Sequence, residues 1–170
     1  GALSPSLKKA PLFGTLMSDV DETCEYVLDP DDPDTWGGEE GDECYVDEDV
    51  LNEDGVWTCP HDAEEEEDLC IFHLPPNNKP DNINYGNRIE DLVENADTDI
   101  RKNRTQFIGS YFTDLDISGS VIHNTSDSNI NMKHTQFFGD ADFSDSELHG
   151  FVFSGAKFHG DANFKNSCLY

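Results

Sequence analysis

Large apolar residues return at every fifth position through the last part of the chain, from residue 105 to residue 169. Asp127 interrupts this series once, and one extra residue is inserted before Phe143 and again before Phe164. The residue two positions before each apolar position is mostly small. We call the apolar positions centres; in order they are Phe107, Phe112, Ile117, Ile122, Met132, Phe137, Phe143, Leu148, Phe153, Phe158, Phe164 and Leu169.

A five-residue period fits neither a helix nor a flat strand, because five steps turn a helical side chain by roughly 140° and place a strand side chain on the opposite face. A chain that turns once per unit keeps every centre inside, which predicts a solenoid. Both insertions lie in segments of the form F-x-G-D-A-x-F, 137–143 and 158–164, which are 21 residues apart. Four units plus one insertion give this offset, so we predict four sides per coil and stacked bulges at Gly139 and Gly160.

Three units match a known pattern most closely: Ala141-Asp142-Phe143, Ala156-Lys157-Phe158 and Ala162-Asn163-Phe164. In these units the segment resembles a pentapeptide-repeat protein, whose family pattern is A-[DN]-[LF]-x-x. The resemblance implies an all-β fold, a right-handed four-sided (quadrilateral) β-helix with the centre and the small residue both inside. We expect this β-helix to span residues 101–170.

The region before the repeats divides into four further segments. Residues 1–16 contain two lysines and no acid, and we interpret them as a leader or tag-like extension before Met17. Residues 17–74 form an acidic Cys/His module, and residues 75–86 are a proline-rich linker. Residues 87–100 place Ile89, Leu92, Val93 and Ala96 at helical spacing, which predicts a helix that caps the first coil; a partner-binding helix is the alternative.

The net charge of -27 is concentrated in the front half of the chain. No Lys or Arg occurs between residues 10 and 78, whereas the repeat region is close to neutral. Such a segment repels itself at ordinary ionic strength, but at molar salt the Debye length falls to about 3 Å. We therefore interpret the charge as halophilic adaptation; a disordered acidic tail is the alternative.

Short apolar clusters that carry thiols and imidazoles interrupt the acidic residues, and they have too little apolar mass to fold unaided. A disulfide, buried thiols or structural zinc could stabilise the module. The spacing Cys70-x-x-His73 lets two ligands from one turn reach one ion, and Cys59 and Cys24 would complete a tetrahedral Cys3His zinc site. Competing candidates for the same ion are Cys44 and His61.

The order of these features is also familiar. The sequences C-P-H at 59–61 and C-I-F-H-L-P at 70–75, followed by a helix and the repeats, resemble the front end of pentapeptide-repeat proteins from salt-loving archaea. The resemblance implies architecture and habitat, and no biochemical activity.

The sequence offers no catalytic constellation, because no nucleophile accompanies the histidines at positions 123, 134, 149 and 159, which we expect on the surface. P-loop, dinucleotide fingerprint and basic patch are also missing, so we expect no direct nucleic-acid binding and no enzyme activity. No stretch could span a membrane, which favours a cytoplasmic protein. We expect a scaffold for an unidentified protein partner, with possible homo-oligomers through the β-helix ends; alternatives are a DNA mimic that inhibits a gyrase-type topoisomerase and a zinc-dependent hydrolase.

Overall fold

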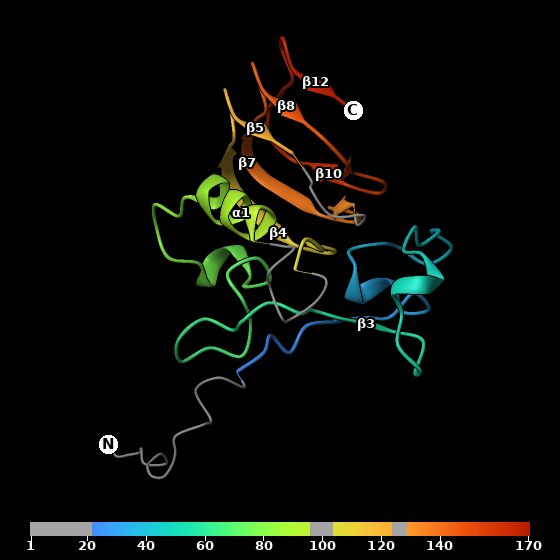
Figure 1. Cartoon of the computed structure of the whole chain (residues 1–170). Helices are drawn as coiled ribbons and strands as arrows, with labels where there is room; N and C mark the ends of the chain where they lie inside the picture. Colours follow the sequence, from blue (N-terminus) through green and yellow to red (C-terminus); the bar gives the residue numbers. More distant parts are fainter. Residues whose placement is uncertain (1–21, 96–103, 124–128) are drawn as a thin grey trace.

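Short strands account for most of the regular structure in the computed structural model, which describes residues 22–95, 104–123 and 129–170 (Figure 1). One α-helix accompanies them, so the predicted all-β character with one small helix is confirmed. The interpreted leader, the interruption at Asp127 and the predicted helical residues 96–100 lie outside the described residues.

The strands of the repeat region pair in parallel and form three separate sheets among the described residues. The first sheet contains β4 (Tyr111–Asp116), β7 (Gln136–Asp142), β10 (Lys157–Phe158) and β11 (Ala162–Asn163). The second contains β5 (Val121–Ile122), β8 (Glu147–Leu148) and β12 (Cys168–Leu169), and the third contains β6 (Ile130–Asn131) and β9 (Phe151–Val152). Every pairing joins strands that are far apart in sequence, so the chain returns repeatedly to the same place.

The strand register follows the spacing of the two insertions. Gln136 pairs with Lys157 and Ala141 with Ala162, so the two F-x-G-D-A-x-F segments lie one on the other. The register between β4 and β7 shifts beside Gly139, which has a φ of 81°. A Cβ atom on Gly160 would lie 2.2 Å from the carbonyl oxygen of Gly139. The two glycines therefore stack at a bulge, where there is no room for a Cβ atom and only glycine fits.

The centres form three layers with different exposure. Those of the first two layers are buried, with relative exposures from 0% to 3% (Phe107, Phe112, Ile117, Ile122, Met132, Phe137, Phe143, Leu148). In the third layer, Phe158 and Phe164 stack on Phe137 and Phe143 at 4.6 Å between ring centroids. Yet these two rings are 38% and 37% exposed, and Leu169 is 55% exposed. These centres therefore lie over those of the second layer, as the period predicts, and the described residues cover them on one side only.

Helix α1 (Tyr85–Glu94) begins two residues before the predicted start. The Asn84 side chain accepts a hydrogen bond from the backbone N–H of Asn87 and so caps the first turn. Its buried residues include Tyr85, whose ring meets Phe112 edge-on at 5.0 Å, and Ile89. The helix thus packs against the first layer of centres, and its role as a cap stays a prediction. Within the described residues, no helix is both long and apolar enough to cross a bilayer.

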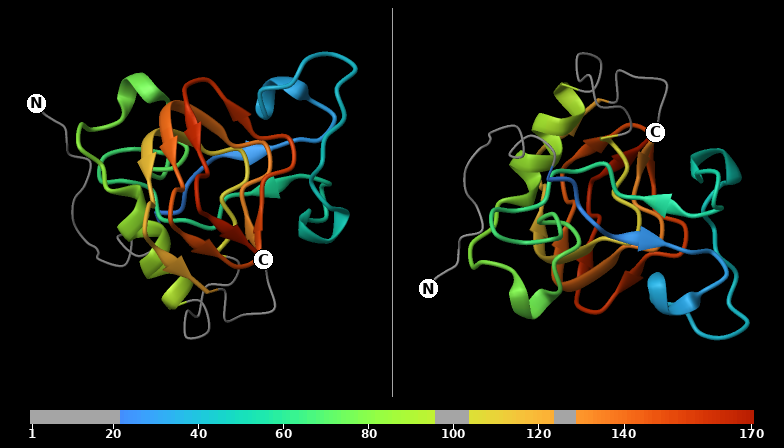
Figure 2. Two further views of the ribbon diagram at one scale, coloured as in Figure 1. Left: turned by 90° about the horizontal axis from the view of Figure 1, so that it is seen from above. Right: turned by 90° about the horizontal axis from the view of Figure 1, so that it is seen from below.

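The acidic module covers the same end of the repeat region (Figure 2). Its strands β2 (Val27–Leu28) and β3 (Trp57–Thr58) are antiparallel, and 3-10 turns lie at Pro33–Thr35, Glu48–Val50 and Pro76–Asn78. Phe72 packs on Phe107 at 4.9 Å between ring centroids, and its carbonyl accepts the backbone N–H of Tyr111 at 2.7 Å. The segment around Phe72 therefore packs on the first layer of centres, as the helix does.

A second contact joins the module to the side of the repeat region. The Nε2 atom of His134 accepts the backbone N–H of Tyr45 at 2.8 Å, and Trp36 packs on the imidazole at 4.6 Å. Lys133 forms an ion pair with Asp47 at 2.9 Å. His134 is only 4% exposed, so the expectation that it lies on the surface is wrong; the module covers it.

Candidate metal centre

Two of the four predicted ligands flank the small β2–β3 sheet. Cys24 precedes β2, and its backbone N–H donates to the His61 carbonyl at 2.9 Å. Cys59 directly follows β3, and its N–H donates to the Tyr26 carbonyl at 3.2 Å. These cross-strand bonds place the two cysteines side by side although 35 residues separate them in sequence.

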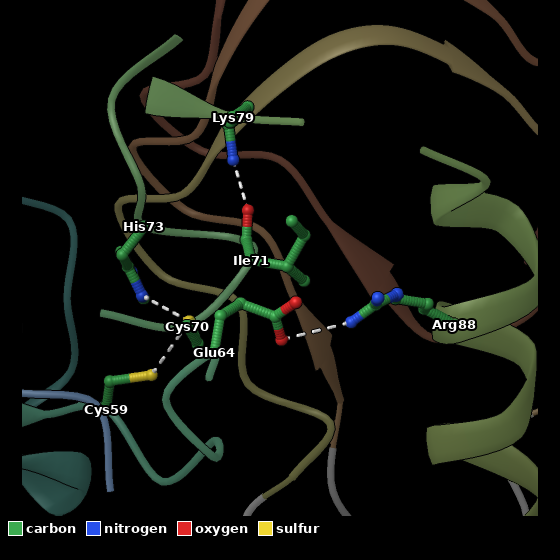
Figure 3. Close-up of polar contacts among 7 residues, drawn as sticks. All are labelled: Cys59, Glu64, Cys70, Ile71, His73, Lys79 and Arg88. Atoms are coloured by element: carbon green, nitrogen blue, oxygen red, sulfur yellow. Dashed lines mark hydrogen bonds and ion pairs between the residues drawn. The ribbon is translucent and has the colours of Figure 1, made fainter. Parts of the chain in front are cut away.

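The other two ligands come from one tight turn. The backbone N–H groups of His73 and Leu74 both donate to the carbonyl of Cys70 at 3.0 Å. This turn brings the His73 Nδ1 atom to 3.2 Å from the Cys70 Sγ atom, a contact that Figure 3 marks with a dashed line. The Cys-x-x-His spacing thus brings two candidate ligand atoms from one turn together, as the sequence predicted.

The structure brings all four predicted ligand atoms together. Cys59 Sγ lies 3.8 Å from Cys70 Sγ, and Cys24 Sγ lies 3.7 Å from His73 Nδ1. All four atoms lie within 4.8 Å of one another, which is close enough to hold a metal ion. Zinc–sulfur bonds of about 2.3 Å at tetrahedral angles separate two sulfur atoms by roughly 3.8 Å, so the donor set and its size fit zinc.

The four side chains are 5% exposed or less, and this burial governs the pKa values of the thiols. Hydrogen bonds from Cys59 and Cys70 lower the pKa of Cys24, which favours one thiolate. Burial raises the pKa of Cys59, and it raises that of Cys70 to about 12. A second and third thiolate therefore require a nearby positive charge, which a divalent cation provides.

Groups around the cluster orient the histidine. With Nδ1 directed at the thiols, the Nε2–H group of His73 donates to the Ile108 carbonyl in the repeat region at 2.8 Å. The Tyr26 ring stacks on the imidazole at 4.0 Å between centroids. Metal-binding histidines typically donate their second N–H to a carbonyl or carboxylate, which fixes the tautomer. This histidine has such a partner.

The two competing candidates lie outside the cluster. The Nε2 atom of His61 bonds the Gln106 carbonyl at 2.7 Å, and its ring stacks on Phe107. Burial lowers the pKa of His61 to about 4, so the ring is neutral near pH 7. Cys44 is half-buried and belongs to no ligand group among the described residues.

A pocket of about 340 Å³ lies between the module and α1, and Cys70 is one of its lining residues. Glu64 and Arg88 form an ion pair across it at 3.3 Å, as Figure 3 shows. Arg104 and Asp62, which also line the pocket, form a second ion pair at 2.9 Å, and the lining indicates no substrate class.

The described part of the chain thus combines sheets of parallel β-strands with a buried Cys3His cluster. Comparisons with known proteins add no family to this description. The chain matches no protein-family model, and searches of curated proteins and solved structures give no significant match. The functional argument rests on the sequence pattern and the geometry.

Proposed function

We propose that Cys24, Cys59, Cys70 and His73 bind one structural zinc ion. Three thiolates and one imidazole supply all four positions of a tetrahedral site, and structural zinc sites have this closed composition. The support is the burial of all four side chains and the hydrogen bond from His73 to Ile108. A hydrolytic zinc site needs an open position for water, so a closed site disfavours the zinc-dependent hydrolase.

We propose further that the repeat region is a right-handed four-sided β-helix of the pentapeptide-repeat type. The register of 21 residues between β7 and β10 and the stacked glycines at 139 and 160 support this proposal. The exposed third layer, with Phe158 and Leu169, supports a contact through this end with another copy of the chain.

We infer that the whole protein is a non-catalytic, halophilic scaffold that binds a protein partner in the cytoplasm. The observation that carries this inference is the position of the turn at residues 70–74, which holds two of the zinc ligands. Phe72 in this turn packs on Phe107, the first centre of the repeat region. The metal then makes the module rigid, and the sides of the repeat region that the module does not cover stay available for a partner. A gyrase inhibitor that mimics DNA would need carboxylates along the stack, whereas the acids are concentrated in the module.

The test is affinity capture in molar salt with the zinc-loaded chain as bait, followed by reconstitution with the purified partner. We expect a stoichiometric complex that Cys70→Ser weakens and Cys44→Ser, a thiol outside the cluster, leaves intact. Failure to reconstitute any captured protein would overturn the scaffold. Inhibition of gyrase supercoiling by the same preparation would favour the DNA mimic instead.

A further inference from the structure

Two of the proposed zinc ligands, Cys59 and Cys70, are thiols that lie next to each other. Their Sγ atoms are 3.8 Å apart, and Figure 3 marks this contact with a dashed line. Both thiols are free, and 11 positions separate them in sequence. A disulfide bond is about 2.05 Å long, so side-chain rotation has to close a gap of roughly 1.8 Å. The two side chains are thus positioned to form a disulfide, a reaction distinct from metal binding.

Access to the pair differs between its two members. Both residues are 2% exposed or less, so an oxidant in bulk solvent does not meet them directly. The pocket of about 340 Å³ between the module and α1 has Cys70 among its lining residues, but not Cys59 or Cys24. A water molecule occupies about 30 Å³ in the liquid, so the pocket admits molecules several times larger. A small oxidant that enters this pocket therefore meets Cys70 first.

We propose that Cys59 and Cys70 are an oxidation site for a small peroxide, which converts them to a disulfide. The Cys70 thiolate attacks one oxygen of hydrogen peroxide, the O–O bond breaks, and Cys70 becomes a sulfenic acid while hydroxide leaves. The Cys59 thiolate then attacks the Cys70 Sγ atom, the S–O bond breaks, and a second hydroxide leaves as the disulfide forms. The two thiolates supply the two electrons that reduce the peroxide.

The disulfide removes two of the four metal ligands, because the thiolate is the form of cysteine that binds a metal. This consequence rests on the zinc site proposed above: with only Cys24 and His73 left, the ion leaves. The turn that carries Phe72 keeps a covalent link to Cys59, so its packing on the repeat region is retained in part. Reduction of the disulfide restores both thiolates and with them zinc binding. The zinc site and the disulfide are therefore two alternating states of the same residues.

The test treats the full zinc-loaded chain with hydrogen peroxide. Cys44→Ser and Cys168→Ser are introduced together, so that only the three thiols of the cluster remain. A chromogenic chelator measures the zinc released, and mass spectrometry locates the disulfide after cleavage at the acidic residues 62–68, which lie between Cys59 and Cys70. We expect one zinc ion released per Cys59–Cys70 disulfide, and zinc binding restored by dithiothreitol.

Two substitutions on α1 test the route through the pocket. Leu92 is half-buried and lines the pocket, so Leu92→Trp fills part of it and should slow disulfide formation several-fold. Asn87 is exposed on the same helix and outside the pocket, so Asn87→Trp adds the same side chain and should leave the rate unchanged. Equal zinc content and equal thermal unfolding before oxidation confirm that both variants are folded.

A disulfide that joins Cys24 to either residue would overturn the choice of pair, and equal rates for the two tryptophan variants would overturn the route through the pocket. Oxidation to sulfinic acid without any disulfide would overturn the proposal as a whole. The zinc site fails separately. If the chain holds no zinc and the Cys59–Cys70 disulfide still forms, the oxidation site stands without it. Zinc that stays bound through the treatment, with no disulfide, gives the opposite result.

Discussion

The acidic module and the repeat region both contain strands of only two residues, yet different contacts hold the two regions together. In the module, β2 and β3 have two residues each, and the tertiary contact that closes it joins Cys24 to His73 across 49 positions. In the repeat region, β4 and β7 have six and seven residues and the other strands two. Each strand pairs with one about 21 to 26 residues further along the chain, so each contact recurs. A periodic sequence distributes its stability over many centres, whereas an aperiodic one depends on a few ligands.

The two regions nevertheless share one hydrophobic cluster, which runs from Cys24 to Leu148. Phe72 and His61 in the module both pack on Phe107 in the first layer. We therefore expect damage to the ligand set to spread into the repeat region, and damage to the third layer to stay local.

The largest effect should come from the metal. Removal of zinc, or Cys70→Ser, eliminates a folding contribution on the order of 10 kcal/mol in comparable structural sites. We expect the module to unfold and the first layer to lose its cover, with a loss of near-ultraviolet circular dichroism from Trp36 and Trp57. Elemental analysis should give about one zinc per chain in the wild type and none in the variant.

Cys44→Ser is the control for this experiment, because Cys44 is half-buried and outside the cluster. Full zinc content and unchanged thermal unfolding in Cys70→Ser would contradict the metal site. Equal losses in Cys44→Ser and Cys70→Ser would instead indicate that Cys44 takes part in the ligand set.

The second effect compares centres within the repeat region. Phe137 is 1% exposed and stacks between Phe112 and Phe158, so Phe137→Ala should lower the free energy of unfolding by about 3–5 kcal/mol. Phe164→Ala removes a ring that is already 37% exposed and should cost less than half as much. Urea unfolding in molar salt measures both, and equal losses would show that the third layer is covered in solution.

The five-residue period carried most of what was predictable about the repeat region. It located the centres, and the inserted residues located the stacked bulges at Gly139 and Gly160, because a period is a local property of the chain. The exposure of Phe158 does not follow from the period, since the period fixes which centres stack on one another but not what covers the third layer.

The candidate site was predictable in part. Cys70 and His73 come from one turn, so their spacing alone indicated that they bind the same metal ion. Cys24 and Cys59, rather than Cys44, are brought to the site by the pairing of β2 with β3. Strands of two residues leave only a weak pattern in the sequence, so this pairing was hard to predict. The burial of His134 depended on a contact with Tyr45 across 89 positions, and no local pattern encodes such a contact.

A third, smaller effect should appear with pH at the side contact. Burial, with Lys133 and Lys157 nearby, lowers the pKa of His134 to about 4 from an ordinary 6.5. The unfolded chain therefore binds more protons between these values, so this stabilisation is complete above pH 6.5 and is lost as the pH falls toward 4. Protonation also places an N–H on Nε2 opposite the N–H of Tyr45, which removes that hydrogen bond.

His134→Gln isolates this contribution, because glutamine can accept the Tyr45 N–H but does not titrate. We expect the wild type to lose stability more steeply than the variant between pH 6.5 and 4 in chemical unfolding. Protonation of the zinc ligands affects both proteins equally and cancels in the difference. Parallel curves for the two proteins would show that His134 titrates normally.

The smallest effect should come from ion pairs between the module and the rest of the chain, and they differ in burial. Arg88 and Glu64 are 47% and 29% exposed at their side chains, so a double-mutant cycle with Arg88→Gln and Glu64→Gln should give a coupling of about 0.2–1 kcal/mol that molar salt removes. Lys133 is only 10% exposed, so its pair with Asp47 should keep more of its coupling in salt. If both couplings persist equally at high salt, screening does not govern the acidic module and the halophilic interpretation fails. If only the Lys133–Asp47 coupling persists, the module tolerates its charge because salt screens the exposed acids while ligands and buried contacts hold the fold.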